Sequence, residues 1–341
     1  MMLSFQLFGE AGRDNALLVK IDSGQAVSRL LFDCGESCLA VLPFAEVREI
    51  DHLLFSHLHM DHVAGFDTFF RCVYGRTDRP NHLWGPPGTG GILHHRVRGF
   101  LWNLVGGRQA SWQVHDLHPG RIETHRFELA EAFAQAHDGE ERSWDRTIVE
   151  GPGYSVEALL MDHGTPSAAY VVREAPRVNV DPARLTDLGL RPGPWLQRVR
   201  GPRADDAETI DVGGQPRRVR ELQESLVTVT PGDSVAYLTD FLLDDAAADR
   251  LSEALKGVGS VVCESQYRHD DLELARRNYH MTARQVASLA ARVGVDRLVL
   301  FHLSDRYRPE EWAELVAEAR AVFPTTSFPD HWVSAELTGG N

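Results

Sequence analysis

Apolar and polar positions form two recurring patterns along the chain. Short apolar runs rich in valine, leucine and phenylalanine recur, which is typical of buried β-strands. Five of them end at a polar residue: "DHLLFSH" at His57, "YSVEALLMDH" at His163, "DSVAYLTD" at Asp240, "GSVVCES" at Glu264 and "VDRLVLFH" at His302. Because reactive side chains of α/β proteins collect where strands end, these five endings predict one shared site.

The second pattern has apolar residues at helical spacing. It predicts helices over residues 62–74, 244–256, 282–293 and 310–322. The third is marked most clearly, since Thr282 and Gln285 have capping-box spacing and Gly294 lies just past its end. Strands and helices interleave throughout, so we expect an α/β fold.

Two stretches look like insertions within what we expect to be a single domain over residues 1–341. Residues 105–150 mix glycine and histidine with a short amphipathic helix pattern, "FELAEAFAQA". Residues 174–232 are proline-rich with little apolar periodicity, so we expect a protruding arm there.

Composition is that of a soluble globular protein, with 43% hydrophobic and 25% charged residues. No apolar stretch approaches the roughly 20 residues that span a bilayer, and the N-terminus lacks a secretory pattern. We therefore expect a cytoplasmic protein without a membrane partner. The four cysteines lack paired spacing and are expected to be reduced. Cys34 and Cys38 could share a metal, but no second pair follows them.

Charge limits the possible partners. Lys and Arg number 35 against 49 Asp and Glu, which gives a net charge of −14. Such a surface repels polyanions, so any nucleic-acid role must depend on a local basic patch.

The segment "HLHMDH", residues 57–62, concentrates metal-ligand chemistry. In H-x-H the imidazoles of His57 and His59 lie on one side of an extended chain and can converge on one ion at roughly 2.0–2.1 Å. Asp61 and His62, at the next turn, can face a second ion. The alternative is a surface loop of ordinary histidines. Most of the chain's 16 histidines are expected to be of that kind, among them His94, His95, His115, His118, His125 and His331.

Two ions need further ligands from the other strand ends. His163 would complete three histidines on the first ion, and His302 would join Asp61 and His62 on the second. Asp240 could bridge both, since a carboxylate offers one oxygen to each ion.

These motifs resemble a known family. "HLHMDH" followed by a lone His, an Asp and a last His is similar to the metallo-β-lactamase fold over almost the whole chain. Three segments resemble ribonuclease Z, the endonuclease that trims the 3′ trailer of precursor tRNA. They are "DHGTPSAAYVV" (162–172), the Pro-Gly-Pro arm "LGLRPGPWLQRVRGP" (188–202), and the block 264–307 with its H-[SM]-T and H-x-S-x-R-Y elements.

The resemblance implies an αββα sandwich of two face-to-face sheets with helices outside. It assigns His57, His59 and His163 to one zinc, Asp61, His62 and His302 to the other, and Asp240 to the bridge. Mn²⁺ or Fe²⁺ could take the place of Zn²⁺ on such ligands. It also implies a homodimer, and substrate contacts by Arg198, Arg200, Arg306 and Tyr307.

The resemblance further adds His280 and its partner Glu264. Two zinc ions would lower the pKa of a bridging water, and Asp61 would orient the resulting hydroxide as the general base. His280, held by Glu264, would give a proton to the departing ribose oxygen. The alternative for His280 is a helix N-terminal histidine with no catalytic role.

Some features depart from the family. "LTDF" stands in place of G-D-T, and "LFGEAGRDN" replaces the usual glycine-rich opening. From Arg191 to Glu221 the arm has seven arginines against five acids, an excess of only two for gripping RNA. "GPPGTGGI" (85–92) resembles an ATPase phosphate loop, but Gly91 stands where the lysine belongs, so we expect a turn-rich loop near the site.

Three functions follow, in order of preference. The first is a dinuclear zinc phosphodiesterase that cuts precursor tRNA. The second is a metal-dependent hydrolase of a small phosphodiester or ester-like metabolite, which the acidic composition favours. The third is a non-catalytic RNA-binding scaffold, which is disfavoured because structural zinc sites are usually closed and cysteine-rich. β-Lactam hydrolysis is disfavoured because a bridging aspartate suits phosphate chemistry.

Overall fold

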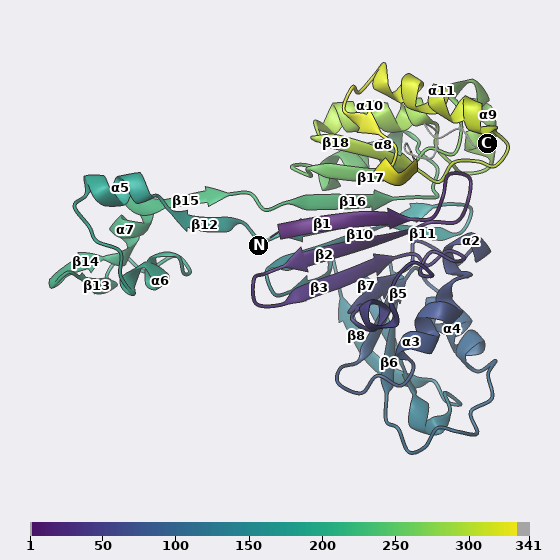
Figure 1. The fold of residues 1–341 in the computed structure, drawn as a ribbon, viewed down its shortest axis with the longest axis horizontal. Coiled ribbons are helices and arrows are strands. Elements are labelled where there is room, and N and C mark those ends of the chain that lie inside the picture. Colours follow the sequence, from purple (N-terminus) through teal and green to yellow (C-terminus); the bar gives the residue numbers. More distant parts are fainter. Residues whose placement is uncertain (1, 333–341) are drawn as a thin grey trace. The chain divides into compact units, whose positions relative to one another are not determined.

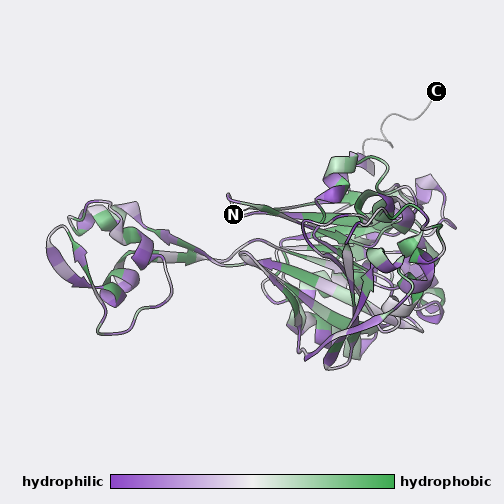
Figure 2. Cartoon of the chain, turned by 90° about the horizontal axis from the view of Figure 1, so that it is seen from below, coloured by the Kyte–Doolittle hydropathy of each residue, from purple (hydrophilic) through white to green (hydrophobic). Residues whose placement is uncertain are grey.

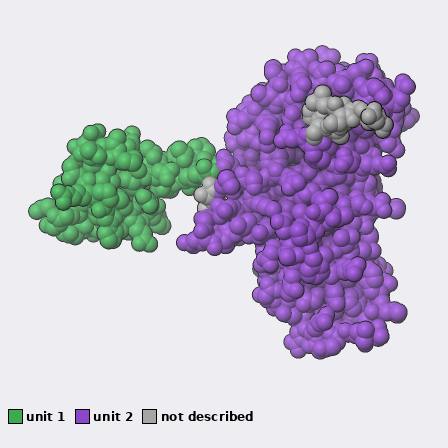
Figure 3. Space-filling model, viewed as in Figure 1, with its two compact units in different colours: residues 1, 174–232 green, residues 2–173, 233–341 purple. Residues whose placement is uncertain are grey.

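A computed structural model describes residues 2–332 of the chain, and these fall into two compact units. One unit comprises Met2–Arg173 and the chain from Asp233 onward, and the other comprises Glu174–Gly232 (Figure 3). The second unit coincides with the predicted arm.

Two large β-sheets form the larger unit (Figure 1). The first runs in sequence order: β1 (Met2–Phe8), β2 (Ala16–Asp22), β3 (Val27–Phe32), β4 (His52–Leu54), β5 (Asn81–Gly85), β6 (Ser111–His118), β7 (Arg121–Glu128) and β8 (His137–Ser143). The second has the order β19 (Thr326–Ser327), β18 (Arg297–Phe301), β17 (Ser260–Glu264), β16 (Ser234–Leu238), β11 (Pro166–Glu174), β10 (Tyr154–Asp162) and β9 (Thr147–Gly151).

Apolar side chains pack between the sheets and against the helices outside them. Leu54, Trp84 and Ile122 of the first sheet share one buried cluster with Val156 and Tyr237 of the second. The alternate residues of the first sheet belong to a second cluster with the helices that cover it. Figure 2 shows the apolar residues concentrated on the sheets. The predicted αββα sandwich is thereby confirmed.

Helices cover both outer faces. Those between the strands of the first sheet are α1 (Phe44–Arg48), α2 (Met60–Val63), α3 (Phe66–Val73) and α4 (Thr89–Val97), with the 3-10 turn η1 (Leu129–Glu131) after β7. Those of the second are α8 (Asp245–Ala254), α9 (Leu272–Arg277) after the 3-10 turn η2 (His269–Asp271), α10 (Ala283–Val293) and α11 (Pro309–Arg320). Across residues 2–332 no helix has the length and apolar character needed to cross a membrane.

Three of the four predicted helices are confirmed, namely α8, α10 and α11. The capping box of Thr282 and Gln285 forms, and Gly294 ends α10 in the left-handed conformation. The helix expected over 62–74 is wrong as one element, because the chain breaks between α2 and α3. Gly65 lies so close to Gly35 that an added Cβ would stand 2.2 Å from the Gly35 carbonyl oxygen.

The stretch 105–150 differs from its expectation in two respects. It supplies β6, β7 and β8 to the first sheet. The amphipathic pattern "FELAEAFAQA" is not a helix: Phe127 and Glu128 end β7, and η1 follows. Phe127, Leu129 and Phe133 are all buried in the cluster beneath α3 and α4, so tertiary packing outweighs the local periodicity.

The arm unit has its own small core. Its elements are β12 (Arg177–Val180), α5 (Pro182–Asp187), α6 (Trp195–Val199), β13 (Thr209–Val212), β14 (Gln215–Arg218), α7 (Val219–Leu226) and β15 (Val227–Thr230). β12 pairs with β15, and β13 pairs with β14. Trp195, Val199 and Leu226 are among the residues that pack together inside it.

Candidate metal centre

Strand ends bring the predicted residues to one edge of the sandwich. β16, β17 and β18 are parallel, so their carboxyl ends lie side by side. Glu264 ends β17, His302 follows β18, and Asp240 lies two residues beyond β16. The end of β10 delivers His163 to the same edge, since β10 and β16 both flank β11 and run opposite to it.

The "HLHMDH" loop is joined to this edge from the other sheet. It follows β4, and the two residues just before it, Phe55 and Ser56, accept hydrogen bonds from β11. Ala168 N–H donates to the Ser56 carbonyl at 2.8 Å, and Tyr170 Oη donates to the Phe55 carbonyl at 2.7 Å. These bonds position His57 opposite His163.

Several residues at the site have strained backbones. Asp33, Asp240 and His302 have φ values of 56°, 53° and 52°. The left-handed conformation is uncommon for residues other than glycine and costs on the order of 1 kcal/mol or more each, a cost that concentrates at functional sites. Here the left-handed conformation directs each side chain away from the line of the preceding strand and toward the shared edge of the sandwich.

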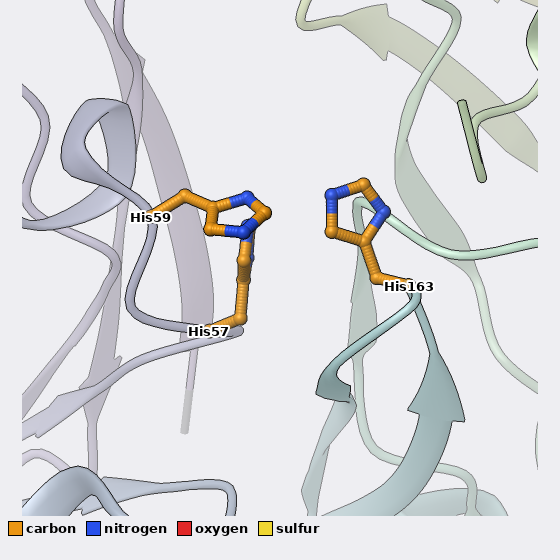
Figure 4. A group of neighbouring side chains, drawn as sticks. All are labelled: His57, His59 and His163. Atoms are coloured by element: carbon orange, nitrogen blue, oxygen red, sulfur yellow. The ribbon is translucent and has the colours of Figure 1, made fainter.

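The first group of candidate ligands is His57, His59 and His163 (Figure 4). One ring nitrogen of each lies within 4.8 Å of the others. His57 and His163 are buried, whereas His59 is exposed. Three imidazoles at this spacing suit a divalent transition metal with an open coordination position.

The second group is Asp61, His62, Asp240 and His302. Asp61 Oδ2 lies 3.3 Å from both His62 Nε2 and His302 Nε2. Asp240 Oδ2 lies 3.5 Å from His62 Nε2. Two carboxylates and two imidazoles thus converge on one point.

Asp240 faces both groups. Its Oδ2 lies 4.0 Å from His57 Nε2 and 3.8 Å from His163 Nε2, in addition to its contact with His62. Asp240 is therefore placed between the two groups, as a bridging carboxylate requires.

Two observations test whether a metal fits here. The Nε2 atoms of His57 and His62 are buried and have no hydrogen-bond partner among the described residues. Buried polar atoms are normally paired, so these two nitrogens point to a ligand. The set of imidazoles and carboxylates is also the chemistry that divalent transition metals select. The residues therefore fit two divalent cations.

The ionisation of the site agrees with this fit. Burial, with the neighbouring histidines, lowers the pKa of His57 to about 2, so its imidazole is neutral and can bind a metal. Burial alone would lower the pKa of His302, but Asp240 and Asp61 raise it to about 10. Burial would raise the pKa of Asp61, yet the hydrogen bond from His302 and the charge of the neighbouring His62 hold it below its usual value. A cation would replace the protons on these imidazoles.

His280 and Glu264 form a pair beside the second group. His280 Nδ1 lies 2.8 Å from Glu264 Oε2 and 3.8 Å from Asp240 Oδ2. Glu264 is fully buried. Burial opposes the charged form of His280, but the Glu264 carboxylate raises the pKa of the imidazole above its ordinary value.

Asp33 is a residue of the candidate site that our sequence reasoning missed. Its carboxylate accepts from His62 Nδ1 at 2.8 Å, from the Ser56 backbone N–H and hydroxyl at 2.7 Å, and from Tyr237 Oη at 2.8 Å. It thereby fixes the His62 ring with Nε2 toward the candidate metal. The signal was present in the sequence, because Asp33 also follows an apolar run, "LLF".

We expect Asp33→Asn to lower metal affinity at the second group by about 10- to 100-fold, the usual effect of losing a partner of a metal-bound histidine. Asparagine keeps the size but not the charge that holds His62 Nδ1–H. Metal retention during titration with a chelator measures the effect. Asp51→Asn, which removes a carboxylate that accepts from Arg29 N–H at 2.8 Å, is the control. Equal retention in both variants would contradict the assigned role of Asp33.

The four predicted substrate-contact residues differ in their local surroundings. Arg200 and Arg306 are exposed, and the Arg306 guanidinium lies over the Tyr267 ring at 5.9 Å. Arg198 is held by Glu208 within the arm. Tyr307 is buried, with its hydroxyl donating to Asp271 and accepting from the Arg268 N–H. These bonds hold the loop that carries Tyr307, and a contact between Tyr307 and substrate stays a prediction.

In the segment "GPPGTGGI" (85–92), the backbone N–H groups that could bind an anion are already occupied by a side chain of the protein. Gly88 and Gly90 N–H groups donate to the two oxygens of Asp116 at 2.8 and 2.7 Å. A phosphate at these amides would meet the buried carboxylate. The cysteines considered as a metal pair, Cys34 and Cys38, are free and buried, and they belong to none of the candidate ligand groups among the described residues.

Comparison with known families and curated proteins gives a consistent match. Residues 28–174 match the family described as the beta-lactamase superfamily domain. The chain is 48% identical over 332 residues to ribonuclease Z of Deinococcus radiodurans, covering 97% of this chain and 99% of that protein. It is 32% identical to ribonuclease Z of Myxococcus xanthus, covering 86% and 83%.

Solved structures share the fold at low sequence identity. YhfI of Bacillus subtilis, a metallo-beta-lactamase fold protein, has a TM-score of 0.56 at 13% identity, covering 96% of this chain and 95% of that one. The short form of human tRNase Z has a TM-score of 0.51 at 15% identity, covering 90% and 94%. These two likenesses support the fold alone.

Proposed function

The chain belongs to the ribonuclease Z family of metal-dependent hydrolases, and we propose that it uses two Zn²⁺ ions to cut the 3′ trailer from precursor tRNA. The observation that carries this proposal is that Asp240 lies between the two ligand groups. It faces both candidate ligand groups and also lies 3.8 Å from His280, the expected proton donor. A phosphodiesterase needs the charge stabilisation and the proton donor at one point.

Bound at the two groups, the metal ions would neutralise the phosphodiester oxygens and make water nucleophilic near neutral pH. Asp61 supports this step, because its lowered pKa keeps it ionised and its side chain is 44% exposed toward solvent. An ionised, accessible carboxylate can accept a proton from the attacking water.

His280 supplies the second proton transfer. As the water oxygen bonds to phosphorus, the bond from phosphorus to the ribose 3′ oxygen breaks, and that oxygen needs a proton. Glu264 keeps His280 in one orientation and favours its cationic form, since the carboxylate accepts from Nδ1 and leaves Nε2 to donate.

Exposed arginines of the arm support RNA as the substrate. Ion pairs inside the arm engage Arg198 with Glu208, Arg218 with Glu221 and Arg220 with Asp206. The arginines that remain exposed and make no ion pair in the described structure are Arg191, Arg200, Arg203 and Arg217. They are the groups that the proposal assigns to the phosphate backbone.

A precursor tRNA assay tests the function. We expect a single cut that leaves the discriminator base at the 3′ end of the tRNA. Removal of residues 182–225 of the arm should weaken this cleavage about 100-fold. Asp181 N–H donates to the Leu226 carbonyl at 2.8 Å, so residues 182–225 can be replaced by a two-residue turn without separating β12 from β15.

The same variant should hydrolyse bis-p-nitrophenyl phosphate at the parental rate, which controls for folding of the catalytic unit. Rapid hydrolysis of this small diester by the full chain, without cleavage of the tRNA, would favour the small-phosphodiester alternative. RNA binding without either activity would favour a scaffold.

The proposal also includes a cytoplasmic homodimer. The four cysteines are free, and three of them are buried, which supports a reducing compartment. The dimer depends on the family resemblance, and light scattering of the purified protein measures it.

A further inference from the structure

Each histidine of the two ligand groups that is buried has its second ring nitrogen held by another group. Asp33 holds His62, and Ser56 Oγ lies 3.2 Å from His57 Nδ1. The remaining two are held from a different part of the chain. His163 Nδ1 lies 2.9 Å from the Tyr279 carbonyl oxygen, and His302 Nδ1 lies 3.5 Å from Glu264 Oε2 and 3.4 Å from Gln266 Nε2.

Two of these supports belong to the proton-donor pair. Tyr279 directly precedes His280 in the chain, and Glu264 is the carboxylate that holds His280. One histidine from each ligand group is thus oriented by the residues that position the proton donor.

Tyr279 contacts the His163 turn in two ways. Besides its carbonyl, its ring packs on Gly164, where an added Cβ would lie 3.5 Å from the ring. Residues 279 and 280 are also fixed to the end of α9. The Tyr279 N–H donates to the Arg276 carbonyl at 3.2 Å, and the His280 N–H donates to the Ala275 carbonyl at 2.8 Å.

The backbone of Tyr279 decides where its carbonyl points. Its φ is 57°, in the left-handed region that tyrosine rarely adopts. A change of φ to the usual negative range would rotate the two peptide groups that flank Tyr279 relative to each other. The second of these groups contains the Tyr279 carbonyl and leads into His280.

We propose that Tyr279, through this left-handed backbone, is a positioning residue that orients His163 for metal binding and ties that orientation to the placement of His280. The proposal rests on the proposed function for the role of His280. Its first part, the support of metal binding, is independent of the substrate.

A series at position 279 separates the backbone from the ring. Asparagine adopts the left-handed conformation readily, alanine less so, and β-branched valine least. All three remove the ring. We expect metal affinity, measured by chelator competition, to follow the order Y279N > Y279A > Y279V, with valine about 10-fold or more below asparagine.

Activity gives the second readout. Cleavage of precursor tRNA should fall in the same order, and His280→Ala should retain metal because it leaves the Tyr279 carbonyl in place. The alanine variant covers the case in which the valine variant fails to fold. Equal metal affinity in all three variants would overturn the proposal, whether that affinity is parental or uniformly reduced by loss of the ring. Absence of tRNA cleavage in the parent protein would overturn the proposed function and leave the metal-affinity order intact.

Discussion

Replacing Asp240 with alanine is expected to reduce phosphodiester hydrolysis by about 10³-fold or more, for both precursor tRNA and a small diester. The carboxylate is almost fully buried and lies within 4.0 Å of His57, His62 and His163. Loss of the shared ligand removes several kcal/mol of metal-dependent charge stabilisation, and each 1.36 kcal/mol corresponds to about tenfold in rate.

Metal content separates this loss from simple misfolding. We expect the variant to keep its fold by circular dichroism but to bind fewer than two metal ions per chain. Asp245→Ala is the matched control, because Asp245 is exposed in the first turn of α8. Two tightly bound ions in D240A, with near-parental activity, would show that Asp240 does not join the two groups.

Replacing His280 with alanine is expected to lower cleavage of precursor tRNA by about 10²- to 10⁴-fold, the range of a single general acid. The ribose oxygen is a poor leaving group without a proton, whereas p-nitrophenolate leaves readily without one. Hydrolysis of bis-p-nitrophenyl phosphate should therefore fall much less, and both metal ions should remain.

The pH profile gives a further test of His280. Because Glu264 raises the pKa of His280, the imidazole is protonated below that pKa and loses its proton above it. The rate of tRNA cleavage should fall on the alkaline side of a pKa above the ordinary value of about 6.5. That fall should be absent in H280A. Glu264→Gln should move this fall in rate to lower pH, because the variant lacks the negative charge that raises the pKa of His280.

His137→Ala is the matched control, because His137 also pairs with a carboxylate, Glu131, at 2.6 Å but on β8 outside the candidate site. An equal loss for both substrates in H280A would assign the residue to metal binding or folding and contradict its role as a proton donor.

The sequence predicted the elements whose signals are local. α10 is an example, since its capping box and terminal glycine are set by residues within one turn. The break at Gly65 and the strand that contains Phe127 were not predicted, because each depends on contacts with residues distant in the chain. The hydrogen bond from the buried Tyr307 hydroxyl to Asp271 was not predicted either, because its partner lies 36 positions away in the chain.

The sequence by itself determined which residues are candidate ligands, because ligand chemistry belongs to side-chain type and the spacing in "HLHMDH" fixes its local geometry. Only the tertiary structure decided what orients those ligands. The bonds from His62 to Asp33 and from His163 to Tyr279 join residues 29 and 116 positions apart. Such pairings form when strand ends meet at one edge of the sandwich, and no local pattern encodes them.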